Sequence, residues 1–191
     1  MKERLGIFGG TFDPVHNGHV QIARSFLNSG LIQKLLILLT PSPPHKYGKR
    51  QVDYFHRYNM LKLAFENIEN VEVSDLEMKL SKPSFTLQTV RYLQKENPDQ
   101  QFYLCLGEDS LRDFHKWHKY DELLERLCLI VAKRPGIDTS EVVPEILERT
   151  IFISHEPVSA SSTTIRELNG KKKSDLPLPV AEYIKKHNLY Q

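Results

Sequence analysis

The chain has 191 residues, of which 40% are hydrophobic and 26% are charged, and its net charge is +2. This length supports one domain with a sizeable core, and the composition is typical of a soluble globular protein. So small a positive charge gives no argument for binding to nucleic acid or to a membrane, although it suits a small anionic substrate.

Short apolar runs alternate with amphipathic stretches along the chain. The apolar runs predict strands that are buried on both faces of a parallel sheet, at Arg4–Phe8, Leu35–Thr40, Val71–Ser74, Gln101–Leu106, Cys128–Lys133 and Thr150–Ser154. The stretches between and after them predict helices, at Gly18–Asn28, Tyr54–Phe65, Phe85–Glu96, Tyr120–Leu127, Val142–Glu148, Ser161–Leu168 and Val180–His187. This alternation predicts an α/β fold with a single-domain, Rossmann-like, doubly wound parallel sheet and helices on both faces. We expect residues 1–191 to form one domain, with a small helical C-terminal part over about 157–191.

The loops that follow the strands are the places to look for chemistry. In a doubly wound sheet, ligands bind beyond the carboxyl ends of the strands, near the point where the strand order reverses. The corresponding loops are Gly9–Asn17, Pro41–Arg50, Gly107–His118 and Pro157–Ser162.

The first of these loops carries the sequence GGTFDPVHNGH. Gly9 and Gly10 allow a tight turn that brings backbone N–H groups close to a ligand, and Thr11 adds a hydroxyl. His16 and His19 are three residues apart around the start of the next helix, where they would share one face. A helix N-terminus favours an anion, and imidazoles can donate hydrogen bonds to it, so the loop is a candidate anion site.

Other interpretations of this loop have less support. The sequence has neither G-x-x-x-x-G-K-[ST] nor G-x-G-x-x-G, and the second strand ends in Thr40 and Pro41 rather than in an acid, which argues against a P-loop or a dinucleotide-binding dehydrogenase. A zinc site would need a third ligand at metal-site spacing. From spacing alone, an ordinary turn with locally packed histidines stays open.

The whole run from Gly9 to His19 resembles the signature of the nucleotidyltransferase superfamily that has the H-x-G-H motif. In that superfamily the two histidines contact the triphosphate of ATP. The resemblance therefore implies catalytic roles for His16 and His19. It also implies ATP phosphate binding by Gly9, Gly10, Thr11 and Phe12.

A second run, SSTTIR at residues 161–166, resembles the superfamily's I-S-S-T-x-I-R motif, with Ala160 in the place of an aliphatic residue. Physically it predicts a helix start, where Ser161 or Ser162 caps backbone N–H groups and Arg166 binds phosphate oxygens. An ordinary capped surface helix is the alternative. The resemblance implies ATP binding by Ser161, Ser162, Thr163 and Arg166.

Three further segments narrow the resemblance to the nicotinate mononucleotide adenylyltransferases: PPHK at 43–46, PSFTLQT at 83–89, and Trp117 before the DELL stretch. In that family, the threonine matching Thr86 lies near the pyridine ring and the tryptophan matching Trp117 stacks on it. A flat π-face suits a ring that is both aromatic and cationic. Gln88 replaces the family's aspartate, which leaves that aspartate's role here open.

The run LGED at 106–109 is similar to the family's G-A-D or G-S-D, and KRPG at 133–136 matches its K-R-P-G. We expect Asp109 to hold a ribose hydroxyl, and Glu108 to point outward because of its bulk and charge. The resemblance implies that Lys46 holds the outer phosphates. It implies mononucleotide binding by His45, Thr86, Gly107, Asp109, Trp117 and Arg134.

The reaction implied by the resemblance is transfer of the adenylyl group of ATP to nicotinate mononucleotide, which gives nicotinic acid adenine dinucleotide and pyrophosphate in NAD biosynthesis. Mg²⁺ would bridge the phosphates and take no ligand from protein side chains. Phosphopantetheine or nicotinamide mononucleotide as the acceptor, and a non-catalytic nucleotide sensor, are the alternatives.

We expect small-molecule partners only, with no nucleic acid and no membrane, and the sequence makes no prediction of an oligomer. The absence of a long apolar run predicts a cytoplasmic protein. Cys105 and Cys128 lie in apolar runs and are predicted to be free thiols.

Overall fold

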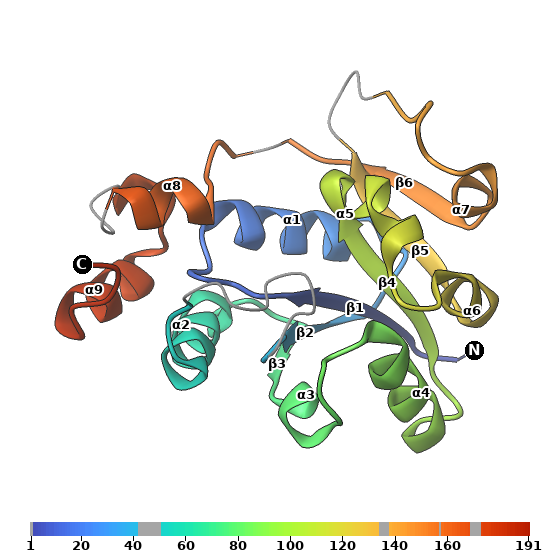
Figure 1. The fold of residues 1–191 in the computed structure, drawn as a ribbon, viewed down its shortest axis with the longest axis horizontal. Helices are drawn as coiled ribbons and strands as arrows, with labels where there is room; N and C mark the ends of the chain where they lie inside the picture. Colours follow the sequence, from blue (N-terminus) through green and yellow to red (C-terminus); the bar gives the residue numbers. More distant parts are fainter. Residues whose placement is uncertain (1, 42–50, 134–137, 157, 169–172) are drawn as a thin grey trace.

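The structure is a computed structural model that describes residues 2–41, 51–133, 138–156, 158–168 and 173–191. Its strands are β1 (Arg4–Gly10), β2 (Lys34–Leu39), β3 (Val71–Ser74), β4 (Gln101–Gly107), β5 (Cys128–Lys133) and β6 (Thr150–Ser154). They form one sheet in the order β3-β2-β1-β4-β5-β6, in which every neighbouring pair is parallel (Figure 1). The strand order reverses between β1 and β4, so the predicted doubly wound sheet is confirmed.

The predicted helices are found close to their predicted ranges: α1 (Asn17–Asn28), α2 (Tyr54–Phe65), α4 (Thr86–Glu96), α6 (Tyr120–Arg126), α7 (Pro144–Glu148), α8 (Ser162–Glu167) and α9 (Leu178–Lys186). Within the described residues, four short pieces were not predicted: α3 (Leu76–Lys79), α5 (Glu108–Arg112) and the 3₁₀ turns Phe114–Lys116 and Lys173–Asp175. Each spans about one helical turn, so its sequence shows little of a helical repeat, although α7, which is as short as α5, was predicted.

The sheet is covered on both faces, and β2 shows why its sequence is continuously apolar. Leu35 and Ile37 pack in one core cluster with Phe26 of α1, whereas Leu36 packs in the other cluster with Val90 of α4. Successive side chains of a strand point to opposite faces, so burial on both sides needs an unbroken apolar run.

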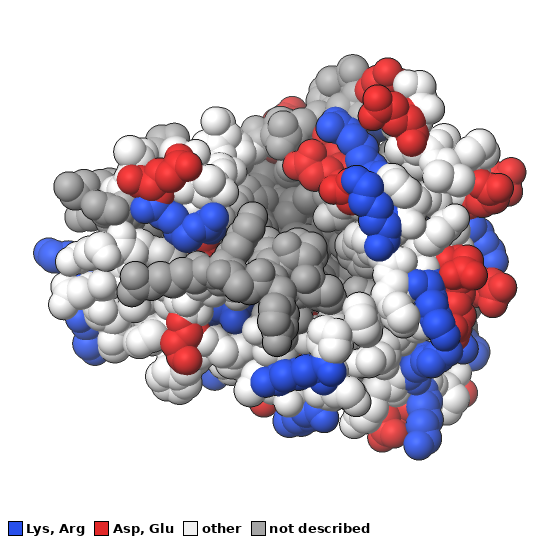
Figure 2. All heavy atoms as spheres, in the orientation of Figure 1, with Lys and Arg blue, Asp and Glu red and all other residues white. Residues whose placement is uncertain are grey.

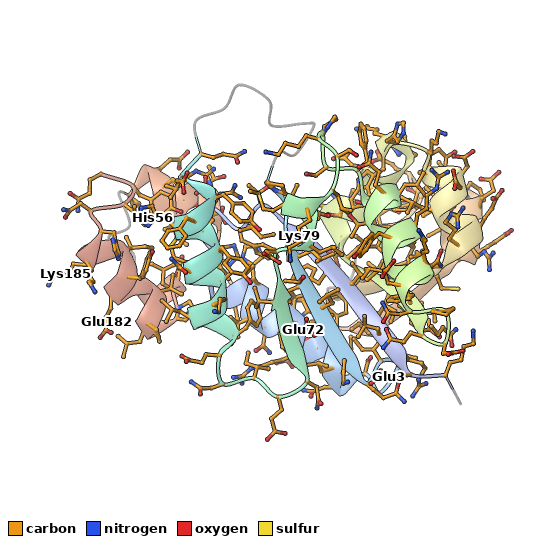
Figure 3. The ribbon with its side chains drawn as sticks, turned by 90° about the horizontal axis from the view of Figure 1, so that it is seen from below. Glu3, His56, Glu72, Lys79, Glu182 and Lys185 are labelled. Atoms are coloured by element: carbon orange, nitrogen blue, oxygen red, sulfur yellow. The ribbon has the colours of Figure 1, made fainter. Side chains whose placement is uncertain are left out.

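The C-terminal helices belong to the same core as the sheet. Ile165 of α8 and Ile184 of α9 are buried in the cluster that contains α1 and α2. α9 lies beside α2, where the Nδ1 atom of His56 is 3.0 Å from the Tyr183 hydroxyl (Figure 3). The chain therefore ends next to the sheet face that carries α1 and α2.

The prediction of free cysteines is confirmed. Both cysteines are free, with Cys105 buried and Cys128 half-buried. None of the helices described in the structure has the length and apolar character needed to cross a bilayer. On the face drawn in Figure 2, acidic and basic side chains are intermixed, in keeping with the small net charge.

Candidate active site

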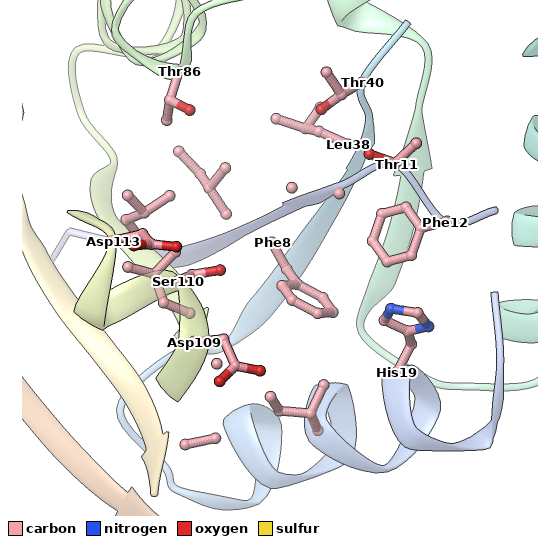
Figure 4. Close-up of a pocket in the computed structure, with 18 of the residues that line it drawn as sticks. Phe8, Thr11, Phe12, His19, Leu38, Thr40, Thr86, Asp109, Ser110 and Asp113 are labelled. Atoms are coloured by element: carbon pink, nitrogen blue, oxygen red, sulfur yellow. The ribbon is translucent and has the colours of Figure 1, made fainter. Parts of the chain in front are cut away.

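A cleft of about 1040 Å³ opens at the carboxyl ends of the central strands. Its walls include Gly9 and Gly10 of β1, Leu106 of β4 and Ala132 of β5. Because the strand order reverses between β1 and β4, the cleft lies at the switch point where ligands bind in this class of sheet. Figure 4 shows His19 and Phe12 on one side of the cleft, with Thr86 and Asp113 across from them.

The loop between β1 and α1 forms one end of the cleft, which we call the phosphate end (residues 9–19). Phe12 has a φ of 45°, in a region that costs a non-glycine residue about 1 kcal/mol. Its ring is only 3% exposed and lies edge-on to Phe8 and His19, at centroid distances of 5.7 and 4.9 Å. Packing of the Phe12 ring offsets the cost of the backbone conformation.

The two histidines of this loop lie together. His16 precedes the first residue of α1 and His19 lies in its first turn, with their ring centroids 3.7 Å apart. The backbone N–H of His16 donates to the Nδ1 atom of His19 at 3.2 Å, so the proton of a neutral His19 ring lies on Nε2. The predicted shared face is confirmed, and both rings line the cleft.

The imidazole of His16 is only 8% exposed, and its Nδ1 atom has no hydrogen-bond partner among the described residues. Burial lowers the pKa of His16 to about 4, while the negative charge of Asp175 acts in the opposite direction. Before a phosphate binds, His16 is therefore neutral at pH 7, so its ring carries a single donor N–H rather than the two of an imidazolium.

Steric contacts explain why glycine stands at position 18, within the H-x-G-H motif, and at position 10. A Cβ atom at Gly18 would lie 3.0 Å from the His16 ring, and one at Gly10 would lie 2.9 Å from the Phe12 ring. Both distances are shorter than side chains tolerate without moving. Glycine at these two positions therefore lets the two rings keep their places beside the cleft.

The SSTTIR segment packs against this loop. The Ser162 hydroxyl donates to the carbonyl oxygen of Pro14 at 2.9 Å, and Arg166 Nη1 donates to the carbonyl oxygen of Asp13. Ser161 occupies the N-cap position of α8 but makes no side-chain cap bond, so the predicted serine cap is wrong. The Ser162 hydroxyl lies within the helix and is engaged with Pro14 instead.

The members of this segment differ in their relation to the cleft. Ser161 and Ser162 line it, whereas Thr163 and Arg166 do not. Arg166 Nη2 donates to Thr163 Oγ1 at 3.2 Å, so the guanidinium of Arg166 holds the loop and its own helix. Phosphate binding by Thr163 and Arg166 stays a prediction.

The other end of the cleft, which we call the ring end, is built from the segments at 84–89 and 117–118. Thr86 begins α4, and Trp117 follows the 3₁₀ turn; both line the cleft. Trp117 is half-buried, with its ring 5.2 Å from that of Phe114, so it is partly packed and partly open to the cleft. Phe85 and His118 stack at 4.2 Å beside it.

The strand-to-helix junction at Gly107 corrects one prediction. Gly107 and Asp109 line the cleft, and the Asp109 side chain is 95% exposed. Glu108, which we expected to point outward, is only 9% exposed and lines the cleft as well. Glu108 is the first residue of α5, where successive side chains point about 100° apart, so Glu108 turns inward while Asp109 takes the open side.

A buried carboxyl group at the ring end was missed by the sequence analysis. Glu77 of α3 is 6% exposed, and Thr89 Oγ1 donates to its Oε1 atom at 3.0 Å. Burial raises the pKa of Glu77, while hydrogen bonds from Thr89 and Thr40 act in the opposite direction. The Oε2 atom of Glu77, the hydroxyl of Ser84 and the Oε1 atom of Gln88 are buried without a hydrogen-bond partner in the described part of the chain.

Several predicted residues cannot be placed. His45, Lys46 and Arg134 lie outside the described residues. Other cleft residues were not predicted, although the strand-end rule applied to the neighbouring loops would have found most of them: Thr40, Ser84, Phe85, Ser110, Asp113, Lys116, His118 and His155. The described residues contain no group of three or more His, Cys, Asp or Glu side chains that could hold a metal ion.

With this geometry in place, comparison with known proteins decides the family. Residues 7–168 match the family model described as cytidylyltransferase-like. The chain is 38% identical to a probable nicotinate-nucleotide adenylyltransferase of Clostridium tetani, with all of both chains covered. The chain belongs to the cytidylyltransferase-like family, among the nicotinate-nucleotide adenylyltransferases. It is also 35% identical to the nicotinate-nucleotide adenylyltransferase of Bacillus subtilis, over 99% of each chain.

Solved structures of nicotinate-nucleotide adenylyltransferases have the same fold. The nicotinic acid mononucleotide adenylyltransferase of Plasmodium falciparum, complexed with NaAD, superposes with a TM-score of 0.80 at 22% identity, over 98% of this chain and 97% of that one. A putative member from Vibrio parahaemolyticus superposes with a TM-score of 0.71. The predicted family and the predicted Rossmann-like fold are thus confirmed.

Proposed function

We propose that the protein transfers the adenylyl group of ATP to nicotinate mononucleotide and releases pyrophosphate. The observation that carries this proposal is one cleft with two chemically different ends. Paired histidine rings 3.7 Å apart lie at the start of α1, and Trp117 lies across the same cleft. The relatives' names, which specify nicotinate-nucleotide adenylyltransferase, support the same reaction.

At the phosphate end, the work is positioning and neutralisation of charge. A phosphate oxygen of the mononucleotide attacks the α-phosphorus of ATP, the bond from that phosphorus to the bridging oxygen breaks, and pyrophosphate leaves. The attacking phosphate is already an anion, so no general base is required. We assign His19 to the α-phosphate in the transition state and His16 to the neighbouring phosphates, with Gly9, Gly10, Thr11 and Phe12 shaping the loop around them.

At the ring end, Trp117 offers a π-face to the pyridinium ring, and Thr86 lies on the same wall of the cleft. Asp109 extends into the open part of the cleft, where its carboxylate accepts a ribose hydroxyl beside Gly107. We further assign His45 and Arg134 to the mononucleotide.

The proposed site also includes residues that bind the outer phosphates of ATP. We assign Lys46, Arg166 and Thr163 to them, together with Ser161 and Ser162 on the cleft wall. Mg²⁺ suits this site because it keeps most of its water and takes phosphate oxygens as ligands. The ion would neutralise charge on the phosphates.

The proposal also includes one domain over residues 1–191, small-molecule partners and a cytoplasmic location, where ATP is available.

A direct test is to incubate the protein with ATP and Mg²⁺ and to add nicotinate mononucleotide, nicotinamide mononucleotide or phosphopantetheine in separate reactions. We expect the fastest pyrophosphate release with nicotinate mononucleotide. No release with that acceptor, or a clear preference for either of the other two, would overturn the proposal.

A further inference from the structure

Three interacting groups lie next to the cleft at its phosphate end without lining it, two of them buried and the third half-buried. Arg57 of α2 is 2% exposed and Asp13 of the loop is 5% exposed. The hydroxyl of Tyr190, the penultimate residue of the chain, donates to Asp13 Oδ1 at 2.7 Å. These groups come from three distant parts of the sequence and meet where the C-terminus lies beside α2 and α8 (Figure 1).

Arg57 connects the residues that directly follow β1 and β2. Its Nη1 atom donates to the carbonyl oxygen of Thr11 at 2.7 Å and to that of Thr40 at 3.2 Å, and its Nε atom donates to the carbonyl of Val52 at 2.9 Å. The guanidinium also lies 5.7 Å from the centre of the Tyr54 ring. Burial lowers the pKa of Arg57, and the negative charge of Asp13 acts in the opposite direction, so the two groups balance each other's charge.

The bonds to this loop hold its carbonyl groups away from the cleft. The oxygens of Thr11 and Asp13 flank Phe12, whose φ is 45°, and they bind Arg57 and Arg166, which do not line the cleft. A carbonyl oxygen that turned toward the cleft would present the negative end of its dipole to a triphosphate. A strained backbone keeps its conformation only where the surroundings hold it firmly, and the two guanidinium groups do so here.

We propose that Tyr190, through Asp13 and Arg57, positions the loop that carries His16 and His19 for adenylyl transfer, so that the C-terminus of the chain is part of the catalytic architecture. This inference rests on the function proposed above. Without the Tyr190 hydroxyl, the Asp13 carboxylate loses a donor and competes for the Arg57 guanidinium. Arg57 then releases the carbonyl of Thr11, and the loop loses its alignment with the transition state.

The first test compares two tyrosines of the same C-terminal region. Tyr190→Phe removes only the hydroxyl that reaches Asp13. Tyr183→Phe, the matched control, removes a hydroxyl that contacts His56 and Asn59 where α9 packs on α2. At a temperature where all proteins are folded, we expect Tyr190→Phe to lower kcat about fivefold or more, with the KM of each substrate nearly unchanged. Tyr183→Phe should match the unmodified protein.

A second readout needs no substrate and separates this inference from the proposed reaction. The imidazole NMR signals of His16 and His19 should shift in Tyr190→Phe and stay in place in Tyr183→Phe. Arg57→Lys keeps the charge but loses the two-carbonyl contact, so it should shift the same signals and lower kcat further. If the unmodified protein shows no adenylyl transfer, the proposed function fails while the NMR comparison still tests the loop.

Three results would overturn the positioning role of Tyr190. If Tyr190→Phe and Tyr183→Phe give the same kcat and the same histidine signals, the Tyr190 contact has no influence on the loop. An unchanged kcat in Arg57→Lys would have the same meaning. A change in KM alone, with kcat intact, would place Tyr190 in substrate binding and also contradict a positioning role.

Discussion

The phosphate end and the ring end of the cleft are built in different ways. At the phosphate end, the backbone of residues 9–14 is held by bonds from Arg57, Arg166 and Ser162, and the histidine rings lie at a helix start. At the ring end, side chains form the wall: Trp117 is half-buried and open to the cleft, and Phe85 and His118 stack beside it.

This difference separates the reaction from the choice of acceptor. Adenylyl transfer needs a fixed geometry around phosphorus, because small displacements reduce the rate strongly. Recognition of the acceptor ring needs a flat surface and a few polar groups, which side chains on short connecting segments provide. We therefore expect substitutions at the phosphate end to change kcat, and those at the ring end to change KM for the mononucleotide.

The largest effect is expected at His19. His19→Ala removes the hydrogen bond proposed for the α-phosphate in the transition state and should lower kcat about 100-fold or more with the fold intact. Steady-state pyrophosphate release and circular dichroism check this prediction. His115→Ala, at an exposed histidine outside the cleft lining, is the matched control. Near-normal turnover in His19→Ala would remove this residue from the mechanism.

The buried imidazole of His16 predicts a pH-dependent stability. Burial lowers its pKa to about 4, below the value of about 6.5 in an unfolded chain. The unfolded chain therefore binds a proton more readily, and stability falls as the pH drops from 6.5 toward 4. We expect a loss of about 2 kcal/mol from this group between pH 7 and pH 4.5.

The measurement is urea unfolding of the unmodified protein and of His16→Asn at both pH values. The variant lacks the titrating ring, so its free energy of unfolding should fall by about 2 kcal/mol less over the same range. Identical pH dependence in the two proteins would show that His16 is not buried as a neutral group.

A smaller effect is expected at the ring end. Trp117→Ala should raise the KM for nicotinate mononucleotide about tenfold, because the stacking face is lost, while the KM for ATP stays nearly constant. Trp117→Phe keeps a π-face and should show a much smaller rise. Tyr92→Ala, at an exposed aromatic residue of α4 outside the cleft lining, is the control. Equal increases in both KM values for Trp117→Ala would refute the division between the two ends.

The smallest effect concerns the polar groups beneath the ring end. Thr89→Val removes the donor to Glu77 and should lower the free energy of unfolding by about 1 to 2 kcal/mol. Gln88→Met removes an acceptor oxygen that has no partner among the described residues, so it should change stability by less than about 0.5 kcal/mol. Chemical denaturation of both variants tests this contrast, which would fail if Gln88→Met were the more destabilising change.

Much of the fold could be predicted from residue patterns because each signal is local. β2 is continuously apolar because both of its faces are buried, and α2 begins and ends where its sequence predicts. The short helices α3 and α5 were not predicted, since a single turn shows little of a repeat, although α7, which is as short as α5, was predicted. Glu108 was misplaced because its orientation depends on how α5 leaves β4, which no local pattern records.

By itself, the sequence determined the succession of strands and helices along the chain, the H-x-G-H loop and the family. These features depend on neighbouring residues and fixed spacing. Only the tertiary structure decided that Arg166 holds the loop carbonyl of Asp13, that His16 is neutral, and that Tyr190 reaches Asp13 from the other end of the chain. These features arise from burial and from contacts between residues far apart in the sequence. Such contacts form only when the sheet brings the segments together.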